Sequence, residues 1–168
     1  MNYQFRKAKT EEIPEIWMIL QAAIQRRKED GSTQWQDGYP NPEVIKKDIE
    51  KEVAYVLTEE ETIVGYCAIL INDEPEYEKL IGKWLSNGDY IVFHRVAIAE
   101  THLGKGLAKK LMNFIEATAR EKNIYSIKAD TNFDNLIMMS IFEKMGYQYC
   151  GEVYFRGSAR RAYEKLLN

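Results

Sequence analysis

The middle of the chain reads HRVAIAETHLGKGLAKK over residues 94–110. The β-rich residues before this turn predict a strand over Tyr90–Ile98, and the apolar residues after it recur at helical spacing. The pattern therefore predicts a strand, a glycine-containing turn and a long helix over Gly106–Lys122. A turn that joins a strand to a helix in this way is a candidate anion-binding site.

The turn itself has the residue types that a phosphate group requires. Gly104 and Gly106 allow positive φ angles and carry no side chains, so successive N–H groups can face outward at the start of a helix. The helix dipole adds a partial positive charge there, and Lys105, Lys109 and Lys110 add full charges. By itself, however, a Gly-Lys-Gly sequence is equally typical of a simple tight loop.

Two common phosphate-binding motifs are excluded by the spacing. The stretch lacks Gly-x-x-x-x-Gly-Lys-Ser/Thr, the motif of nucleoside-triphosphate P-loops. Lys109 stands where the dinucleotide-binding motif Gly-x-Gly-x-x-Gly has its third glycine.

The flanking sequence predicts a mixed α/β (α+β) fold. Six further strands are expected, at Tyr3–Lys7, Ala54–Thr58, Thr62–Ile71, Ser126–Thr131, Tyr147–Val153 and Arg160–Leu166. Three further helices are expected: one that Thr10 caps, one that Asn41 and Pro42 begin and that ends near Glu52, and one over Asn135–Met145. The segments Glu59–Glu61 and Gly157–Ser158 are expected to turn, and Asn72–Gly88 has room for a short helix. This order predicts antiparallel pairs early in the chain and a β-α-β crossover in the middle.

Length and composition favour one soluble domain over residues 1–168, because single domains commonly contain roughly 100 to 200 residues. The net charge of -3, from 23 basic and 26 acidic residues, gives no reason to expect nucleic acid as a partner. Two cysteines and two histidines without metal-ligand spacing predict no metal site. With neither a signal peptide nor an apolar run of about 18 residues, we expect no membrane association and a cytoplasmic location.

Two separated motifs resemble those of the GNAT superfamily of acyl-CoA-dependent N-acyltransferases. The first is Leu103-Gly104-Lys105-Gly106-Leu107-Ala108 after the strand residues Val96-Ala97-Ile98, and the second runs Asn135, Met138, Phe142, Gly146, Tyr147. The resemblance extends over essentially the whole chain. It implies a GNAT-type, mostly antiparallel twisted sheet of about six to seven strands, flanked by about four helices.

The resemblance also implies which residues hold the cosubstrate, acetyl-coenzyme A. They are Val96, Ala97, Ile98, Leu103, Gly104, Lys105, Gly106, Leu107, Ala108, Lys109, Asn135 and Phe142. Two of these positions depart from the family pattern. Leu103 replaces the usual Arg or Gln, and Phe142 replaces a Tyr that in many members protonates the departing thiolate.

By resemblance, an amine of the acceptor attacks the thioester directly in a ternary complex. His94 is the first candidate for the base, because imidazole titrates near neutrality; the alternative is a strand histidine that only bonds locally. The N–H of Val96 is the expected oxyanion donor. Tyr147 and Tyr154 are candidate acids or packing residues, and Asn135 is a pantetheine ligand, a helix cap, or both.

The acceptor is expected to be the primary amine of a small molecule or peptide. In this family the loop that contains Trp35 and Tyr39 commonly borders the acceptor pocket; the alternative is that both side chains fill the core. The acidic run Asp73–Glu78 is either solvated surface or an attraction for a cationic amine.

Two alternatives remain open at this point. One is an acyl-CoA-binding regulatory or interaction domain that transfers nothing, which Leu103 and Phe142 suggest. The other is a structural α/β module with a chance glycine turn. A homodimer is compatible with either alternative and with the enzyme.

Overall fold

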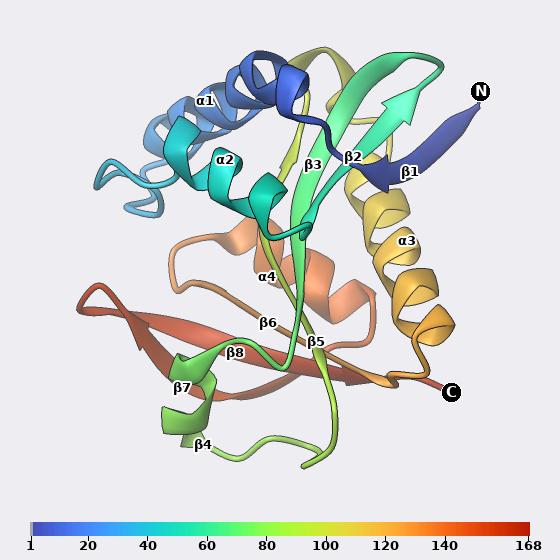
Figure 1. Cartoon of the computed structure of the whole chain (residues 1–168). Coiled ribbons are helices and arrows are strands. Elements are labelled where there is room, and N and C mark those ends of the chain that lie inside the picture. Colours follow the sequence, from blue (N-terminus) through green and yellow to red (C-terminus); the bar gives the residue numbers. More distant parts are fainter. Residues whose placement is uncertain (1) are drawn as a thin grey trace. The chain divides into compact units, whose positions relative to one another are not determined.

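A computed structural model describes residues 2–168, which form mixed α/β secondary structure (Figure 1). The strands are β1 (Tyr3–Lys7), β2 (Ala54–Glu59), β3 (Thr62–Ile71), β4 (Ile81–Gly82), β5 (Ile91–Ile98), β6 (Ser126–Asn132), β7 (Gln148–Phe155) and β8 (Ser158–Leu166). The helices are α1 (Ile13–Glu29), α2 (Pro42–Glu50), α3 (Leu107–Glu121) and α4 (Leu136–Lys144). Three short 3-10 helices, η1 (Thr10–Glu12), η2 (Pro75–Lys79) and η3 (Glu100–His102), complete the described elements.

The chain divides into two compact units. The first consists of Met1–Ile69 and Arg95–Phe114, and the second of Leu70–His94 and Ile115–Asn168. Since β3, β5 and α3 each contribute residues to both, the units are interleaved in sequence. The expectation of a single domain stays a prediction.

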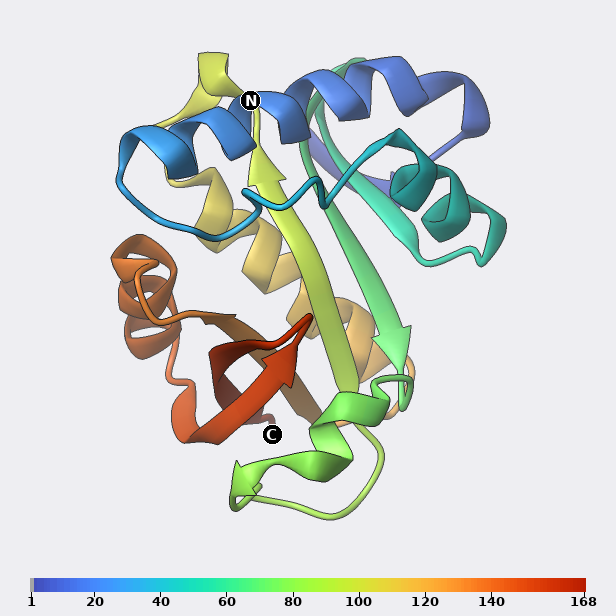
Figure 2. The same ribbon diagram turned by 90° about the vertical axis from the view of Figure 1, so that its left-hand side faces the viewer.

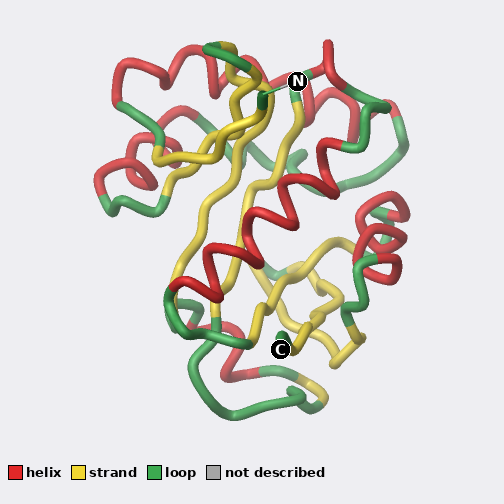
Figure 3. Tube along the Cα trace, turned by 90° about the vertical axis from the view of Figure 1, so that its right-hand side faces the viewer, coloured by secondary structure: helices red, strands yellow, loops and turns green. Residues whose placement is uncertain are grey.

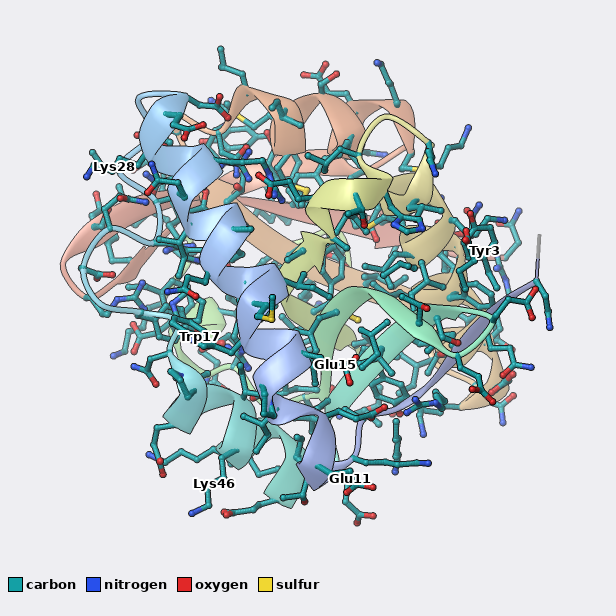
Figure 4. The ribbon with its side chains drawn as sticks, turned by 90° about the horizontal axis from the view of Figure 1, so that it is seen from above. Tyr3, Glu11, Glu15, Trp17, Lys28 and Lys46 are labelled. Carbon is teal, nitrogen blue, oxygen red and sulfur yellow. The ribbon has the colours of Figure 1, made fainter. Side chains whose placement is uncertain are left out.

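The first unit is built on antiparallel strands and two packed helices. Phe5 of β1 pairs with Leu57 of β2, and Val56 of β2 pairs with Tyr66 of β3. The helix α1 packs against α2 and η3 (Figure 2). The buried apolar core of these elements includes Ile16, Leu20, Ile45, Val56, Leu57 and Val64. Figure 4 shows two charged residues of this unit, Glu11 of η1 and Lys46 of α2, at the outer edge.

The second unit combines one parallel and several antiparallel pairs. Ile91 of β5 pairs in parallel with Ile127 of β6, and the connection between these strands contains α3, drawn as one continuous helix in Figure 3. The predicted β-α-β crossover is therefore confirmed. β8 pairs antiparallel with both β6 and β7. Phe142 of α4 is fully buried, and its ring contacts the rings of Phe93, Tyr147 and Tyr163.

The hydrogen-bonded strand order is β1-β2-β3-β5-β6-β8-β7-β4, a sheet of eight strands. The predicted mixed, mostly antiparallel sheet is confirmed, and it has one strand more than the seven that were placed along the sequence. The strand missed is β4, which is only two residues long and so has no alternating pattern. It exists because Gly82 and Gly151 let two backbones approach: a Cβ on Gly82 would lie 2.1 Å from the carbonyl oxygen of Cys150.

Some predicted boundaries were wrong for local reasons. Thr10 begins η1 instead of capping α1, because the carboxylate of Glu12 accepts a hydrogen bond of 2.8 Å from the main-chain N–H of Lys9 and tightens this turn. The cap of α2 is confirmed, since the Asn41 side chain accepts from the N–H of Val44 at 3.0 Å. That helix ends at Glu50, two residues earlier than expected.

The glycine pair at β4 supplies a stability test. Gly151→Ala should lower the free energy of unfolding by about 2 kcal/mol, because the new Cβ would lie 2.2 Å from the carbonyl oxygen of Ile81, at a φ of 144°. Urea denaturation measures the change. Gly88→Ala is the matched control, since an added Cβ there meets nothing within 4 Å. Equal stability of the two variants would contradict the close approach.

Candidate active site

The turn before α3 is open on its glycine side. Gly104 and Gly106 have φ angles of 78° and 73°, which glycine adopts without strain, and a Cβ added to either would meet nothing within 4 Å. Leu103 beside them is exposed. No side chain of the described residues therefore fills the space next to these two glycines.

The first turn of α3 presents main-chain donors to the same region. The N–H of Lys110 donates to the carbonyl of Gly106 at 3.2 Å, so the preceding N–H groups of residues 107–109 lie before the helical ladder. Gly106 has no side chain with which to cap them. With the helix dipole and the exposed Lys105 and Lys109, these N–H groups form an arrangement suited to an anion.

The strand β5 uses one of its edges for the sheet. The N–H of Ala99 donates to the carbonyl of Val64 in β3 at 2.8 Å. Because main-chain groups alternate between the two edges of a strand, this bond places the N–H and C=O groups of Val96 and Ile98 on the opposite edge. Ala97 and Ile98 are buried. The edge that faces away from β3 can thus offer hydrogen bonds to an extended ligand.

Arg26 lies at this edge, and sequence reasoning missed it. Its Nη2 donates to the carbonyl of Ile98 at 3.2 Å, while its buried Nη1 has no hydrogen-bond partner among residues 2–168. Burial lowers the pKa of Arg26, and the neighbouring charge of Arg27 acts in the same direction. The only signal in the sequence was a basic last turn of α1, Arg26-Arg27-Lys28, whose Lys28 is labelled in Figure 4.

Trp35 and Tyr39 both belong to the first unit. Trp35 is buried, with a φ of 64°. Tyr39 is half-buried, and its hydroxyl accepts a short hydrogen bond from Nη1 of Arg95. The burial of Trp35 fits the core alternative, whereas Tyr39 is held by a polar partner that the sequence did not indicate.

His94 lies in the second unit between two carboxylates. Its Nε2 is 2.7 Å from Oε2 of Glu74, and its Nδ1 is 4.0 Å from Oδ2 of Asp130. Asp130 also accepts from the hydroxyl of Tyr77 at 2.6 Å and from Nη1 of Arg160 at 3.4 Å. The imidazole is therefore oriented by local bonds. Glu74 was visible in the sequence only as part of an acidic run, and Asp130 carried no signal.

The two candidate tyrosine acids have different surroundings. Tyr147 is buried, and its hydroxyl has no hydrogen-bond partner among residues 2–168. Burial raises the pKa of Tyr147 well above its ordinary value, and the charge of Glu116 adds to this shift. Tyr154 is exposed, with its hydroxyl 3.4 Å from Glu152.

The remaining predicted site residues, Asn135 and Phe142, also lie in the second unit. Asn135 caps α4 as predicted, because its Oδ1 accepts from the N–H of Met138 at 3.1 Å. Phe142 is fully buried in the aromatic core described above. The structure thus gathers Val96 to Lys109 with Trp35 and Tyr39 in one unit, and His94, Asn135, Phe142, Tyr147 and Tyr154 in the other.

The described part of the chain has neither a candidate metal site nor a helix suited to a membrane. Across residues 2–168 there is no group of three or more His, Cys, Asp or Glu residues that could hold a metal ion. Over the same residues, every helix is too short or too polar to cross a bilayer.

Comparisons with known proteins identify relatives. A family model described as "Acetyltransferase (GNAT) family" matches residues 17–147. A crystal structure of a GNAT-family acetyltransferase from Streptococcus agalactiae is 36% identical, with a TM-score of 0.89 over 99% of this chain and 96% of that one. The "Uncharacterized N-acetyltransferase YesJ" of Bacillus subtilis is 23% identical over 145 residues, 84% of this chain and 79% of the relative. The structure of yncA from Salmonella typhimurium with its cofactor acetyl-CoA shares the fold, with a TM-score of 0.69 at 16% identity over 99% of this chain and 94% of that one.

The Asn135 cap gives a prediction that separates its two roles. Asn135→Ala should lower the free energy of unfolding by about 1 kcal/mol, the usual effect of losing an N-cap. Chemical denaturation without ligand measures this loss. If Asn135 also binds acetyl-CoA, the rise in Tm that acetyl-CoA produces in the wild type should be smaller in the variant. An unchanged ligand-induced rise would leave the cap as its role.

Proposed function

This chain belongs to the acetyltransferase (GNAT) family, and from that premise we propose that it transfers the acetyl group of acetyl-CoA to a primary amine. The transfer is direct: the amine attacks the thioester carbonyl while both substrates are bound. The observation that carries the proposal is the open turn at Gly104 and Gly106, which leads into the uncapped first turn of α3. The acceptor is an amine of a small molecule or a peptide.

The phosphates of acetyl-CoA bind at this turn. The N–H groups of residues 107–109 and the lysines Lys105 and Lys109 supply donors and positive charge, which suits a diphosphate better than a lone carboxylate. The edge of β5 that faces away from β3 then bonds the pantetheine arm at Val96 and Ile98, where the carbonyl of Ile98 also accepts from Arg26. Each pantetheine amide needs one donor and one acceptor. The residues present therefore suit the phosphates and the pantetheine arm of acetyl-CoA.

The amine must lose a proton before it attacks, since a lysine-like amine has a pKa near 10.4 in solution. His94 takes that proton as the general base. Its Nε2 is held by Glu74 at 2.7 Å, which favours a single orientation of the ring and leaves Nδ1 to accept the proton. Local bonding of His94 is therefore compatible with the role of base.

The carbonyl oxygen of the thioester becomes an oxyanion during attack, and the N–H of Val96 stabilises it. A main-chain donor of this kind needs no reorganisation during the reaction and commonly contributes a factor of about 100 to 1,000 in rate.

The departing group leaves as a thiolate. Phe142 has no proton to give, and the raised pKa of the buried Tyr147 makes it a poor donor. A thiol with a pKa near 8.5 is a tolerable leaving group without protonation. Tyr154, which is exposed, is the remaining side-chain acid.

Leu103 and Phe142 also support a second candidate, an acyl-CoA-binding domain that transfers nothing. Release of free CoA, measured with acetyl-CoA and a panel of amines, distinguishes the two. Amine-dependent release with an acetylated product by mass supports the enzyme. A rise in Tm with acetyl-CoA but no release with any amine supports the binding domain.

The proposed role of His94 predicts the rate of acetyl transfer in variants of this residue. His94→Ala should lower the rate of acetyl transfer by roughly 100-fold or more, because it removes the proposed general base. His94→Gln is the matched control for structure, since it can still bond Glu74 but cannot act as a base. Both variants should therefore be slow. An unchanged pH–rate profile in His94→Ala would remove His94 from the mechanism.

The position of Leu103 predicts that a basic residue there increases the affinity for acetyl-CoA. Leu103→Arg should bind acetyl-CoA roughly tenfold more tightly, because the exposed position can place a guanidinium at the phosphates and a charged hydrogen bond contributes about 1.5–3 kcal/mol. Calorimetric titration measures the Kd. Acetyl-pantetheine, which lacks the diphosphate, should bind both proteins equally. Equal gains for both ligands would place the phosphates elsewhere.

A further inference from the structure

A buried ion pair lies behind the strand that contains the proposed oxyanion donor. Arg95 of β5 donates through Nε to Oδ2 of Asp48 at 2.9 Å and through Nη2 to Oδ1 at 2.6 Å. Asp48 belongs to α2, and both side chains are about nine-tenths buried, with 10% and 6% of their surface exposed. All of these atoms lie in the first unit.

Two tyrosines complete the cluster and leave the pair with little freedom. The hydroxyl of Tyr66, a fully buried residue of β3, donates to Oδ2 of Asp48 at 2.7 Å. Burial and the charge of Asp48 raise the pKa of Tyr66, so this hydroxyl stays protonated and continues to donate. The hydroxyl of Tyr39 accepts from the third nitrogen of the Arg95 guanidinium. The guanidinium is thereby fixed by three of its nitrogens.

The backbone of Arg95 has an unusual conformation at this point. Its φ is 58°, in the left-handed region that a non-glycine residue in a strand rarely adopts. Such residues persist only where their surroundings hold them, and one left-handed residue in a strand re-aims the residues beside it. The next residue is Val96, whose N–H is the proposed oxyanion donor.

We propose that Asp48 is a positioning residue: by its two bonds to Arg95 it holds the left-handed backbone of β5 and so aims the N–H of Val96 at the reacting carbonyl. The inference rests on the proposed function. Asp48 touches neither substrate; it acts through Arg95. A purely structural role, anchoring α2 to the sheet, would instead affect stability alone.

Asp48→Asn tests the proposal directly. It should lower kcat by roughly tenfold or more, because a misplaced oxyanion donor loses much of its contribution. The Kd for acetyl-CoA should change by a smaller factor than kcat, since the phosphate turn and its helix dipole are unaltered and only the pantetheine bonds at Val96 are disturbed. Glu12→Gln is the matched control: Arg6 and Glu12 form a similar two-bond pair in the same unit, at 3.0 Å and 2.6 Å, and this variant should keep the wild-type kcat.

The backbone itself is tested by a pair of double variants. In the Asp48→Asn background, Arg95→Gly should have a higher kcat than Arg95→Ala, because only glycine adopts a φ near 60° without strain. Both lack the same side chain, so the difference reports the backbone. Equal kcat values for the two would overturn the proposal. If the Asp48→Asn variants fail to fold, Arg95→Lys provides the test instead. Lysine keeps the charge but cannot bond both carboxylate oxygens of Asp48, so this variant should also have a lower kcat.

A crystal structure of Asp48→Asn separates this inference from the proposed function. If residue 95 keeps its left-handed φ and Val96 does not move, Asp48 is not a positioning residue, whatever the activity. A change at both residues supports the proposal. The proposed function fails by a different observation, the absence of CoA release from the wild type with every amine.

Discussion

The main-chain N–H and C=O groups of β5 alternate between the two edges of the strand, and the proposed chemistry of this protein depends on which groups face which edge. One edge is joined to β3 through bonds such as that from Ala99 to Val64. The other edge leaves the main chain of Val96 and Ile98 facing away from that neighbour. The strand is followed by η3 and then by the turn of Gly104 and Gly106, so the proposed oxyanion donor and the proposed phosphate site lie close together in the sequence. Main-chain geometry, more than any single side chain, therefore defines the proposed site.

Local chemistry made much of the fold predictable. Asn41 and Asn135 cap the helices that were expected, because an N-cap is decided by a side chain and an N–H group three residues away. The glycine turn was recognised for the same reason. Thr10 was misjudged because Glu12, another local group, tightened the turn first. The strand β4 could not be predicted from the sequence. It depends on the close approach of two glycines that are 69 residues apart, and a local sequence pattern does not report such a contact.

The polar partners of the site could not be predicted, because they are set by tertiary structure. Asp48 precedes Arg95 by 47 residues, and Asp130 follows His94 by 36. Neither carboxylate stands in a motif. Phe142 is the opposite case: its departure from the family pattern was visible in the sequence, but only the structure shows why a phenylalanine is stable there. It fills a buried aromatic core, where burying a hydroxyl without a hydrogen-bond partner costs free energy.

The short strand β4 also has a consequence for the protein in concentrated solution. The border of a β-sheet exposes unpaired N–H and C=O groups, which invite intermolecular pairing and aggregation. Here the last position in the sheet is occupied by a segment of two residues, covering part of the far longer β7. A segment so brief gives an incoming chain almost nothing to extend. The glycine contact thus shortens the stretch of β7 that is left unpaired at this end of the sheet.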